Sequence, residues 1–153
     1  MAIKDELLIG RLSKSDLPAF QQLIQLFGVV FEMEEIKNAP EHYLASLLAN
    51  DAFVVYVAIH NGEVVGGATG YIMPMYYAVA KELYIYDMAV ATNLQGMGVG
   101  KKLIAGLKGY CAQNAVSCMF VEAQEEDNGA IEFYRATSGA GERVVHFNYD
   151  MPR

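Results

Sequence analysis

The turn at residues 95–100 has the composition of a phosphate-binding loop. It reads Gln-Gly-Met-Gly-Val-Gly, is followed by Lys101, and opens a stretch with helical spacing. Glycines let the backbone pass close to a ligand, and the unpaired N–H groups and dipole of a helix start attract anions. A P-loop is excluded because Lys102 stands where Ser or Thr is needed, and a dinucleotide-binding unit usually starts a domain, whereas this turn follows several predicted strands. We predict a diphosphate site made of main-chain donors; the alternative is a tight strand-to-helix connection.

Asp87 is the best candidate for acid–base chemistry. It lies inside a predicted strand, and strand alternation would send Leu83, Ile85, Asp87 and Ala89 to one face. A carboxylate among apolar neighbours is unfavourable without a partner, and burial raises its pKa toward the range of a useful base. Such a group can orient an incoming ammonium and accept its proton, directly or through water. The alternative is an aspartate satisfied by backbone N–H groups.

Acidic residues recur around this strand. Glu122 lies on the predicted neighbouring strand and could share a cleft with Asp87. Two predicted loops carry further acids, and the net charge of −7 argues against a nucleic-acid partner while suiting a cationic substrate. A solvated acidic surface is the alternative. The loop acids are Glu32, Glu34, Glu35, Glu125, Glu126 and Asp127.

Length and composition predict one domain over residues 1–153, since 54% of the residues are apolar and no linker is visible. The longest apolar runs are too short to cross a bilayer, and the amino terminus carries acids where a signal peptide would be apolar. We therefore expect a soluble cytoplasmic protein with no membrane partner. Cys111 and Cys118 are expected to be buried free thiols, and no metal site is expected.

The spacing of apolar and turn-forming residues predicts a mixed α/β sheet of the α+β type. Antiparallel strands come first, and a strand–helix–strand unit then gives one parallel pair by a right-handed crossover. His146 is expected in the core rather than in catalysis, and the loop around Tyr76 and Tyr77 in the core or at a dimer contact. The expected elements are strands at 4–12, 53–59, 63–72, 82–90, 117–123 and 144–149, and helices from Ser15 or Asp16 to Phe31, over 43–48, after Gly100, and from Asp127 or Asn128 to Tyr134; an Asn61-Gly62 turn joins two of the strands.

Two motifs resemble the GCN5-related N-acetyltransferase (GNAT) superfamily. Gln95, Gly98 and Gly100 match its [Q/R]-x-x-G-x-[G/A] motif, and Asn128 with Tyr134 matches its second motif. The resemblance implies the GNAT fold, in which helices flank a mostly antiparallel sheet with a central splayed parallel pair. It also implies acetyl-CoA as cofactor and Tyr134 as the group that protonates the departing thiolate, the alternative being a core aromatic. The implied cofactor contacts are Met88, Ala89 and Val90 for pantetheine, with Gln95, Gly96, Met97, Gly98, Val99, Gly100, Lys101 and Asn128.

Several segments look like the aminoglycoside 3-N-acetyltransferases of type I, among them residues 26–28, 64–66, 84–90 and 145–147. This likeness implies a homodimer and an acetyl transfer to the 3-amino group of an aminoglycoside. Gln124 and residues 136–139 depart from the pattern of that family. The acceptor therefore stays open between an aminoglycoside and another small amine, such as a polyamine or amino sugar, and a non-catalytic acyl-CoA-binding module is a third reading. The expected substrate contacts are Glu32, Glu35, Asp87, Glu122, Glu125 and Asp127.

Overall fold

The computed structural model describes residues 6–153. The chain forms two compact units, with the boundary between Glu122 and Ala123, and each unit is described by itself. The first unit contains a five-stranded sheet with spatial order β1-β2-β3-β4-β5. Neighbouring strands are antiparallel except β4 and β5, which are parallel, so the predicted mixed sheet is confirmed. The strands are β1 (Leu7–Arg11), β2 (Phe53–His60), β3 (Glu63–Pro74), β4 (Lys81–Val90) and β5 (Val116–Val121).

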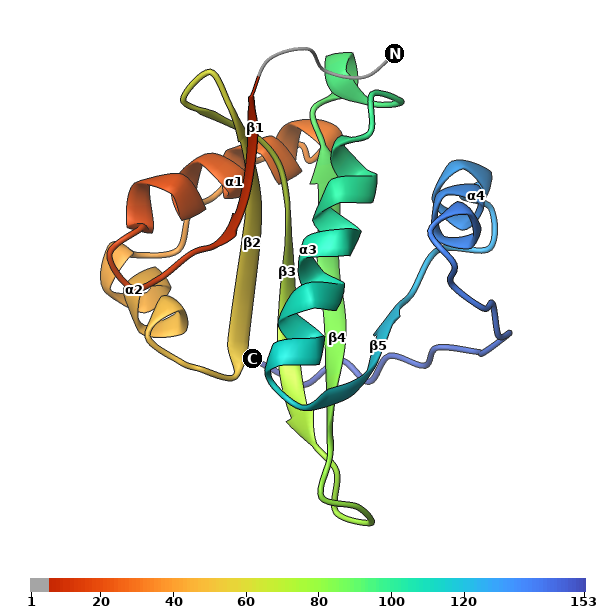
Figure 1. Ribbon diagram of the computed structural model, residues 1–153. Helices are drawn as coiled ribbons and strands as arrows, with labels where there is room; N and C mark the ends of the chain where they lie inside the picture. The colour runs from red at the N-terminus through yellow and green to blue at the C-terminus, as the bar shows by residue number, and fades with distance from the viewer. Residues whose placement is uncertain (1–5) are drawn as a thin grey trace. The chain divides into compact units, whose positions relative to one another are not determined.

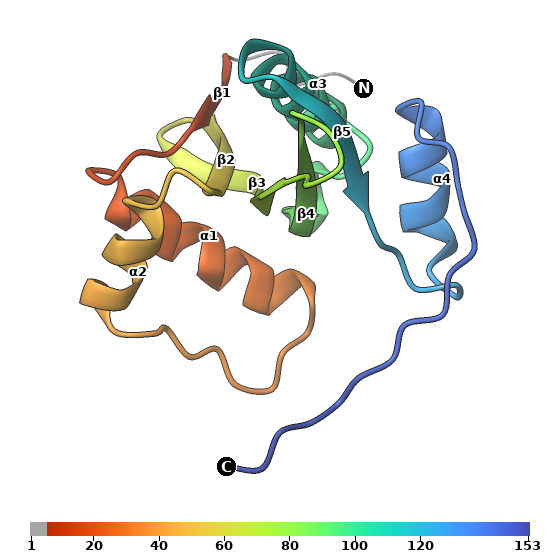
Figure 2. The ribbon, with the colours of Figure 1, turned by 90° about the horizontal axis from the view of Figure 1, so that it is seen from below.

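Helices cover both faces of this sheet (Figures 1 and 2). Helices α1 (Leu17–Val30) and α2 (Glu41–Leu48) lie on one face, and α3 (Val99–Gln113) lies on the other, after the short 3-10 turn η1 (Thr92–Leu94). The α1–α2 side buries Phe20 and Leu23 against strand residues, and the α3 side buries Leu103. The helical period seen in the sequence therefore gives each helix its sheet-facing side.

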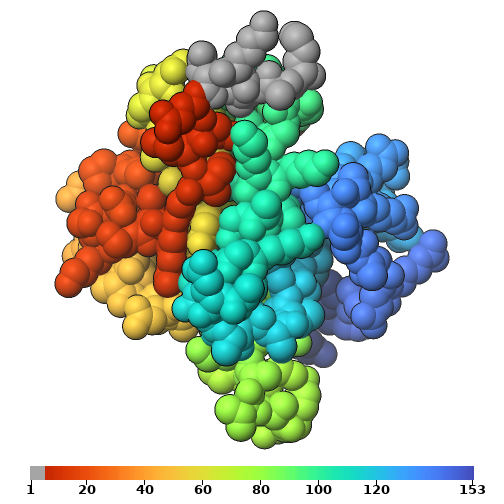
Figure 3. All heavy atoms as spheres, viewed as in Figure 1, coloured from red at the N-terminus to blue at the C-terminus, as the bar shows by residue number. Residues whose placement is uncertain are grey.

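Two hairpins connect the antiparallel strands. Asn61 and Gly62 both have positive φ, 51° and 78°, as a two-residue turn with the twist of the flanking strands requires. The loop between β3 and β4 projects beyond the rest of the first unit (Figures 1 and 3). Its Tyr76 is 97% exposed, so these aromatics do not lie in the core. The dimer contact, which was the other expectation for this loop, stays a prediction.

The second unit contains one helix, α4 (Asn128–Ala136), followed by an extended tail. The strand predicted at residues 144–149 is wrong, because residues 139–153 form neither helix nor strand. A strand needs the edge of another strand to pair its N–H and C=O groups, and this unit offers none in its described residues. The prediction that His146 lies in the core is also wrong, since the residue is exposed and one ring nitrogen lies 3.0 Å from the Asn148 Oδ1.

The two thiols differ in exposure. Cys111, on α3, is buried as predicted, whereas Cys118 is exposed. Cys118 lies on β5, which is an edge strand of the five-stranded sheet. None of the helices formed by the described residues is long and apolar enough to cross a membrane.

Candidate active site

A β-bulge in β4 decides where Asp87 points. Along β3 and β4, Thr69 is opposite Asp87, but the next residue of β3, Gly70, is opposite Ile85. Tyr86 is thus an extra residue in β4, and the strand resumes its alternation in the opposite phase beyond it. Bulges of this kind commonly lie next to functional sites, where they redirect a side chain.

Because of the bulge, the prediction that Asp87 shares a face with Leu83 and Ile85 is wrong. A methyl group on Gly66 would meet Leu103 of α3, and one on Gly70, which points to the same face, would meet Leu83. Leu83 therefore faces α3, whereas Ala89 packs in the α1–α2 core. Asp87, two residues before Ala89, shares its face and so lies on the opposite side from Leu83 and Ile85.

Asp87 is partly buried on the α1–α2 face of the sheet. Burial raises the pKa of its carboxyl above the ordinary value of 3.8. The negative charge of Asp87 in turn contributes to the raised pKa of two phenols, Tyr71 and Tyr84, although burial and the charges of other groups contribute more. A desolvated carboxylate within electrostatic range of two phenols is stabilised by a cation, and an ammonium group provides one.

Glu122 follows β5 and meets the same phenol. The Tyr84 hydroxyl donates a hydrogen bond to the Glu122 carboxylate; burial, then the charge of Glu122 and this hydrogen bond raise the pKa of Tyr84. Because Asp87 adds to the same shift, the two carboxylates act on one hydroxyl from neighbouring strands. The two acids that the sequence placed on adjacent strands are therefore near one another within the first unit.

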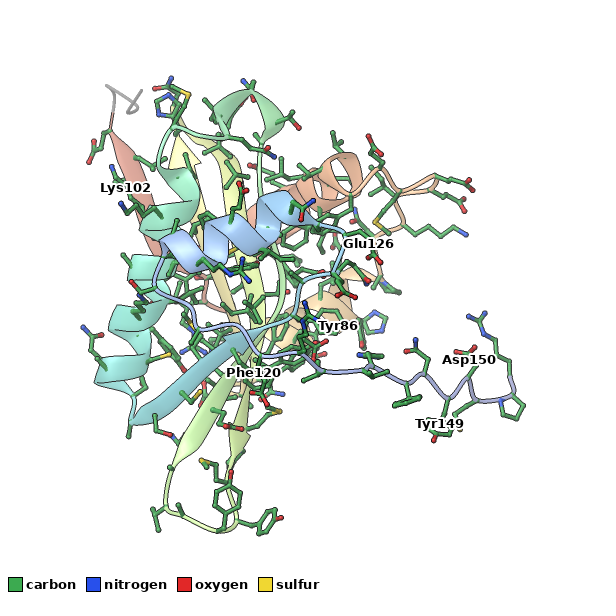
Figure 4. The ribbon with its side chains drawn as sticks, turned by 90° about the vertical axis from the view of Figure 1, so that its right-hand side faces the viewer. Tyr86, Lys102, Phe120, Glu126, Tyr149 and Asp150 are labelled. Carbon is green, nitrogen blue, oxygen red and sulfur yellow. The ribbon has the colours of Figure 1, made fainter. Side chains whose placement is uncertain are left out.

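A row of aromatic rings continues from this point across the strands. Tyr84 stacks on Phe120 of β5 at 4.8 Å and 12°, and meets Tyr86 edge-on at 6.1 Å. Tyr86 meets Tyr71 of β3 at 5.8 Å, and its side chain is 61% exposed. Figure 4 labels Tyr86 and Phe120 at this surface. Sequence reasoning missed the row, although the tyrosines at 84 and 86, just before Asp87, were its signal. Exposed aromatic faces of this kind suit sugar rings and amine cations.

The last residues of β4 do not pair with β5, as expected for a parallel pair whose strands splay apart. Pairing of β4 with β5 ends at Ile85 and Val121, whereas β4 continues to Val90. Beyond the bulge, the edge of β4 that faces away from β3 thus lacks a strand partner among the described residues. Main-chain groups of Met88, Ala89 and Val90 can there bind an extended ligand, as the sequence analysis expected for pantetheine.

The glycine turn has the geometry of an anion cradle. Gly96 and Gly98 have φ of 77° and 90°, which favour glycine, and no atom lies within 4 Å of a methyl group placed on either. Gly98 precedes α3 without any side-chain cap, and the first turn of this 15-residue helix carries no acid. Its leading N–H groups thus remain for a ligand, and the residues present fit a diphosphate.

The side chains around this turn differ in what they offer a ligand. Gln95 donates its amide Nε2 to the Val90 carbonyl at 3.1 Å, which ties the turn back to β4. Val99 is buried at 1% exposure, so only its main chain can face a ligand. Lys101 is exposed on the first turn of α3, and Met97 is partly buried.

The acids of the α1–α2 loop lie at the surface. Glu32 is exposed and has a positive φ of 52°. Glu35 forms an ion pair with Lys37 at 2.9 Å, and both side chains are more than 70% exposed. Pairing and solvent therefore reduce the attraction of Glu35 for a second cation.

The remaining predicted site residues belong to the second unit. The Asp127 Oδ1 accepts a hydrogen bond from the Ala130 N–H at 3.0 Å and caps α4, which begins at Asn128, so this acid has a structural role. Glu125 is exposed. Burial, then the charge of Asp127, raises the pKa of Tyr134 above 10.0, so its phenol is protonated at neutral pH. Among residues 6–153, no three His, Cys, Asp or Glu side chains are grouped to hold a metal ion.

Comparison with known proteins gives consistent matches. The Acetyltransferase (GNAT) family model matches residues 19–140. The crystal structure of an aminoglycoside acetyltransferase, meta-AAC0020, from an uncultured soil metagenomic sample in complex with trehalose superposes with a TM-score of 0.93. It is 42% identical, over 95% of this chain and 97% of that one. The same acetyltransferase in complex with sisomicin also has a TM-score of 0.93, at 41% identity and the same coverage.

A curated relative is more distant. The uncharacterized N-acetyltransferase YhfO of Bacillus subtilis (strain 168) is 24% identical over 147 residues, which make up 94% of this chain and 97% of that protein. A second soil metagenomic aminoglycoside acetyltransferase, HMB0005, has a TM-score of 0.92 at 31% identity, over 96% of this chain and 99% of that one. These similarities extend along almost the whole chain and include both units.

Proposed function

The chain belongs to the acetyltransferase (GNAT) family, and on that premise we propose that it transfers acetyl from acetyl-CoA to the 3-amino group of an aminoglycoside. The observation that carries the proposal is the partly buried Asp87, with Tyr84 and Glu122 beside it, on a face of exposed aromatic rings. Similarity to a structure of an aminoglycoside acetyltransferase in complex with sisomicin supports the substrate class.

The cofactor is held by main-chain groups in this proposal. Bound acetyl-CoA supplies the thioester whose carbonyl carbon the amine attacks. Gly96, Gly98 and the first N–H groups of α3 hold its diphosphate, where the helix dipole favours negative charge. The free edge of β4 at residues 88–90 would bind the pantetheine arm, and a backbone donor near Met88 would be placed to hydrogen-bond the thioester carbonyl oxygen.

Asp87 orients the amine and receives its proton. Most alkyl amines are charged at neutral pH, and an ammonium must lose a proton before its nitrogen can attack. The raised pKa of Asp87 increases the proton affinity of its carboxylate, which is the property that a general base needs. The proton passes to the Asp87 carboxylate directly or through one water molecule.

Tyr134 assists the leaving group. A thiol has an ordinary pKa of about 8.5, below that of a phenol. Because the pKa of Tyr134 is raised further, a full proton transfer to the thiolate is uphill. Hydrogen-bond donation, directly or through a held water molecule, is therefore the main contribution of Tyr134.

The surface around Asp87 favours a flat, polycationic acceptor. Two carboxylates attract amines, and the exposed rings of Tyr71 and Tyr86 can stack on a sugar or lie under a cation. The 3-amino position itself rests on the sequence resemblance of residues 84–90. The expected cytoplasmic location and homodimer remain predictions.

A panel of amines tests this function. Release of the coenzyme A thiol from acetyl-CoA is measured with sisomicin and gentamicin-type compounds, with polyamines, and with simple amino sugars. The proposal predicts turnover of the aminoglycosides with the highest kcat/KM. Turnover confined to polyamines or amino sugars would move the assignment to another small amine, and coenzyme A binding without any turnover would indicate a binding module.

A further inference from the structure

Thr69 on β3 is a polar residue in an apolar part of the core. It is 7% exposed, and no Ser, Asn, Gln, His or charged residue among residues 6–153 is buried to this extent. The residues beside it in the strand, Gly66-Gly67-Ala68 and Gly70, carry no functional group. A buried hydroxyl without a partner costs free energy, so the partner of Thr69 has to be identified.

Asp87 is the polar residue opposite Thr69 in the sheet. β3 lies between β2 and β4, and Thr69 is opposite Val55 on one side and Asp87 on the other. A methyl group on Gly67, two residues before Thr69, would meet Leu23 of α1, so Thr69 also points to the α1–α2 face. Residues directly opposite in an antiparallel pair share a face, and their Cβ atoms lie about 4.5–5.5 Å apart. The hydroxyl and the carboxylate therefore stand side by side.

The two groups do not satisfy one another. No hydrogen bond within residues 6–153 involves the Thr69 hydroxyl, whereas every fully buried side-chain oxygen or nitrogen of these residues has a partner. The Thr69 oxygen is therefore in the small part of the residue that a ligand can reach. Burial is the cause of the raised pKa of the Asp87 carboxyl, and a hydrogen bond donated by Thr69 would lower that pKa. Both groups are thus left for a third partner between them.

We propose that the Thr69 Oγ1 accepts a hydrogen bond from the reacting nitrogen of the acceptor while Asp87 takes its proton. One nitrogen placed between two side chains at this spacing reaches both oxygens at hydrogen-bond distances of about 2.7–3.2 Å. The inference rests on the proposed function, because it needs a primary amine that is deprotonated at Asp87. It names Thr69 as a further substrate-binding residue of that site.

A second acceptor fixes the direction of attack. An ammonium that has given one proton to Asp87 keeps two N–H bonds and one lone pair. When the carboxyl oxygen of Asp87 and the hydroxyl oxygen of Thr69 accept these two N–H groups, the lone pair has one direction left, toward the thioester carbon. A hydroxyl is far too weak a base to take the proton, so Thr69 orients the nitrogen without competing with Asp87. Orientation of this kind lowers the barrier of a bimolecular step.

Two substitutions separate the hydroxyl of Thr69 from its packing. Thr69→Val keeps the branched shape and removes the hydroxyl, whereas Thr69→Ser keeps the hydroxyl and removes the methyl group. With the amine of the panel that wild type acetylates best, we expect Thr69→Val to lower kcat about tenfold to a hundredfold. Thr69→Ser should be faster than Thr69→Val. A residue that only packs gives the reverse order, because valine fills the same volume and serine leaves a cavity.

Thermal unfolding and coenzyme A binding complete the test. The melting temperature of Thr69→Val should equal or exceed that of wild type, because the variant no longer buries an unpaired hydroxyl. Coenzyme A affinity by calorimetry should be retained, so that a stable protein with an intact cofactor site is slow. Thr69→Val with wild-type kcat, or Thr69→Ser slower than Thr69→Val, would overturn the inference.

Asp87→Asn in the same assay separates this inference from the proposed function. A slow Asp87→Asn beside a Thr69→Val of full rate leaves the proposed function standing and overturns the role of Thr69 alone. A wild-type protein that acetylates no primary amine removes both.

Discussion

Replacing Asp87 with asparagine separates its charge from its shape. The side chain keeps its size, so the packing around position 87 changes little while the charge and the proton acceptor are lost. The charge of Asp87 raises the pKa of both phenols. The variant should therefore titrate Tyr84 at a lower pH than wild type, which tyrosine absorbance or NMR detects.

The expected loss of rate follows from the role of a general base. Such a group contributes about 10²–10⁴-fold, which corresponds to roughly 2.7–5.5 kcal/mol of activation free energy. We expect kcat for the aminoglycoside to fall by at least about a hundredfold, while coenzyme A binding by calorimetry stays within a factor of two or so, since its contacts are main-chain groups. Glu63→Gln is the matched control: it removes an exposed charge six residues along β3 from Thr69, about 20 Å away.

The pH dependence of kcat/KM and of stability tests the role of Asp87. A base must be ionised to act, so kcat/KM should rise with pH through a pKa above 3.8, and this acidic limb should vanish in Asp87→Asn. The folded state binds the proton more tightly than the unfolded state, so stability falls as pH rises through that window. The variant should thus unfold at a higher temperature than wild type at pH 7 and lose that advantage below pH 3.8. Wild-type kcat with an unchanged acidic limb would refute the assignment.

Three further variants test the rest of the site. Tyr134→Phe should lower kcat about tenfold to a hundredfold with coenzyme A affinity retained; stopped-flow thiol release measures this, and an unchanged rate would leave Tyr134 as packing. Gly98→Ala should weaken coenzyme A binding about tenfold or more in calorimetry, because an L-residue at φ of 90° is strained. Its control, Gly109→Ala in the same helix, should bind normally and gain about 0.5–1 kcal/mol of stability. Tyr84→Phe removes the hydroxyl that binds Glu122 and should raise the aminoglycoside KM more than it lowers kcat, as initial rates would show.

Most of the fold was predictable because its signals are local. Helical spacing, the Asn61-Gly62 turn and the glycines before α3 each specify their own segment. The prediction of a strand at residues 144–149 was wrong for the opposite reason. The alternation of these residues is a strand pattern, but a strand forms only where the edge of another strand pairs its main chain. Cys118 was misplaced because an apolar strand does not by itself tell which of its residues face the covered side of the sheet.

The site was predictable by residue but not by orientation. Asp87 stood out as a carboxylate within an apolar strand, and Glu122 as an acid on the neighbouring strand. Simple alternation gave Asp87 the wrong face, because the single extra residue Tyr86 reverses the phase and has no sequence signature of its own. The aromatic row was missed because cross-strand ring contacts depend on register, which the sequence does not state.

Product mapping tests the central claim most directly. Sisomicin, acetyl-CoA and the purified protein are incubated, and the product is examined by mass spectrometry and two-dimensional NMR. We predict a single added acetyl group on the 3-amino nitrogen, formed by wild type and nearly absent with Asp87→Asn. Acetylation at a different nitrogen would contradict the proposed position, and an unmodified antibiotic would contradict aminoglycoside acetyl transfer itself.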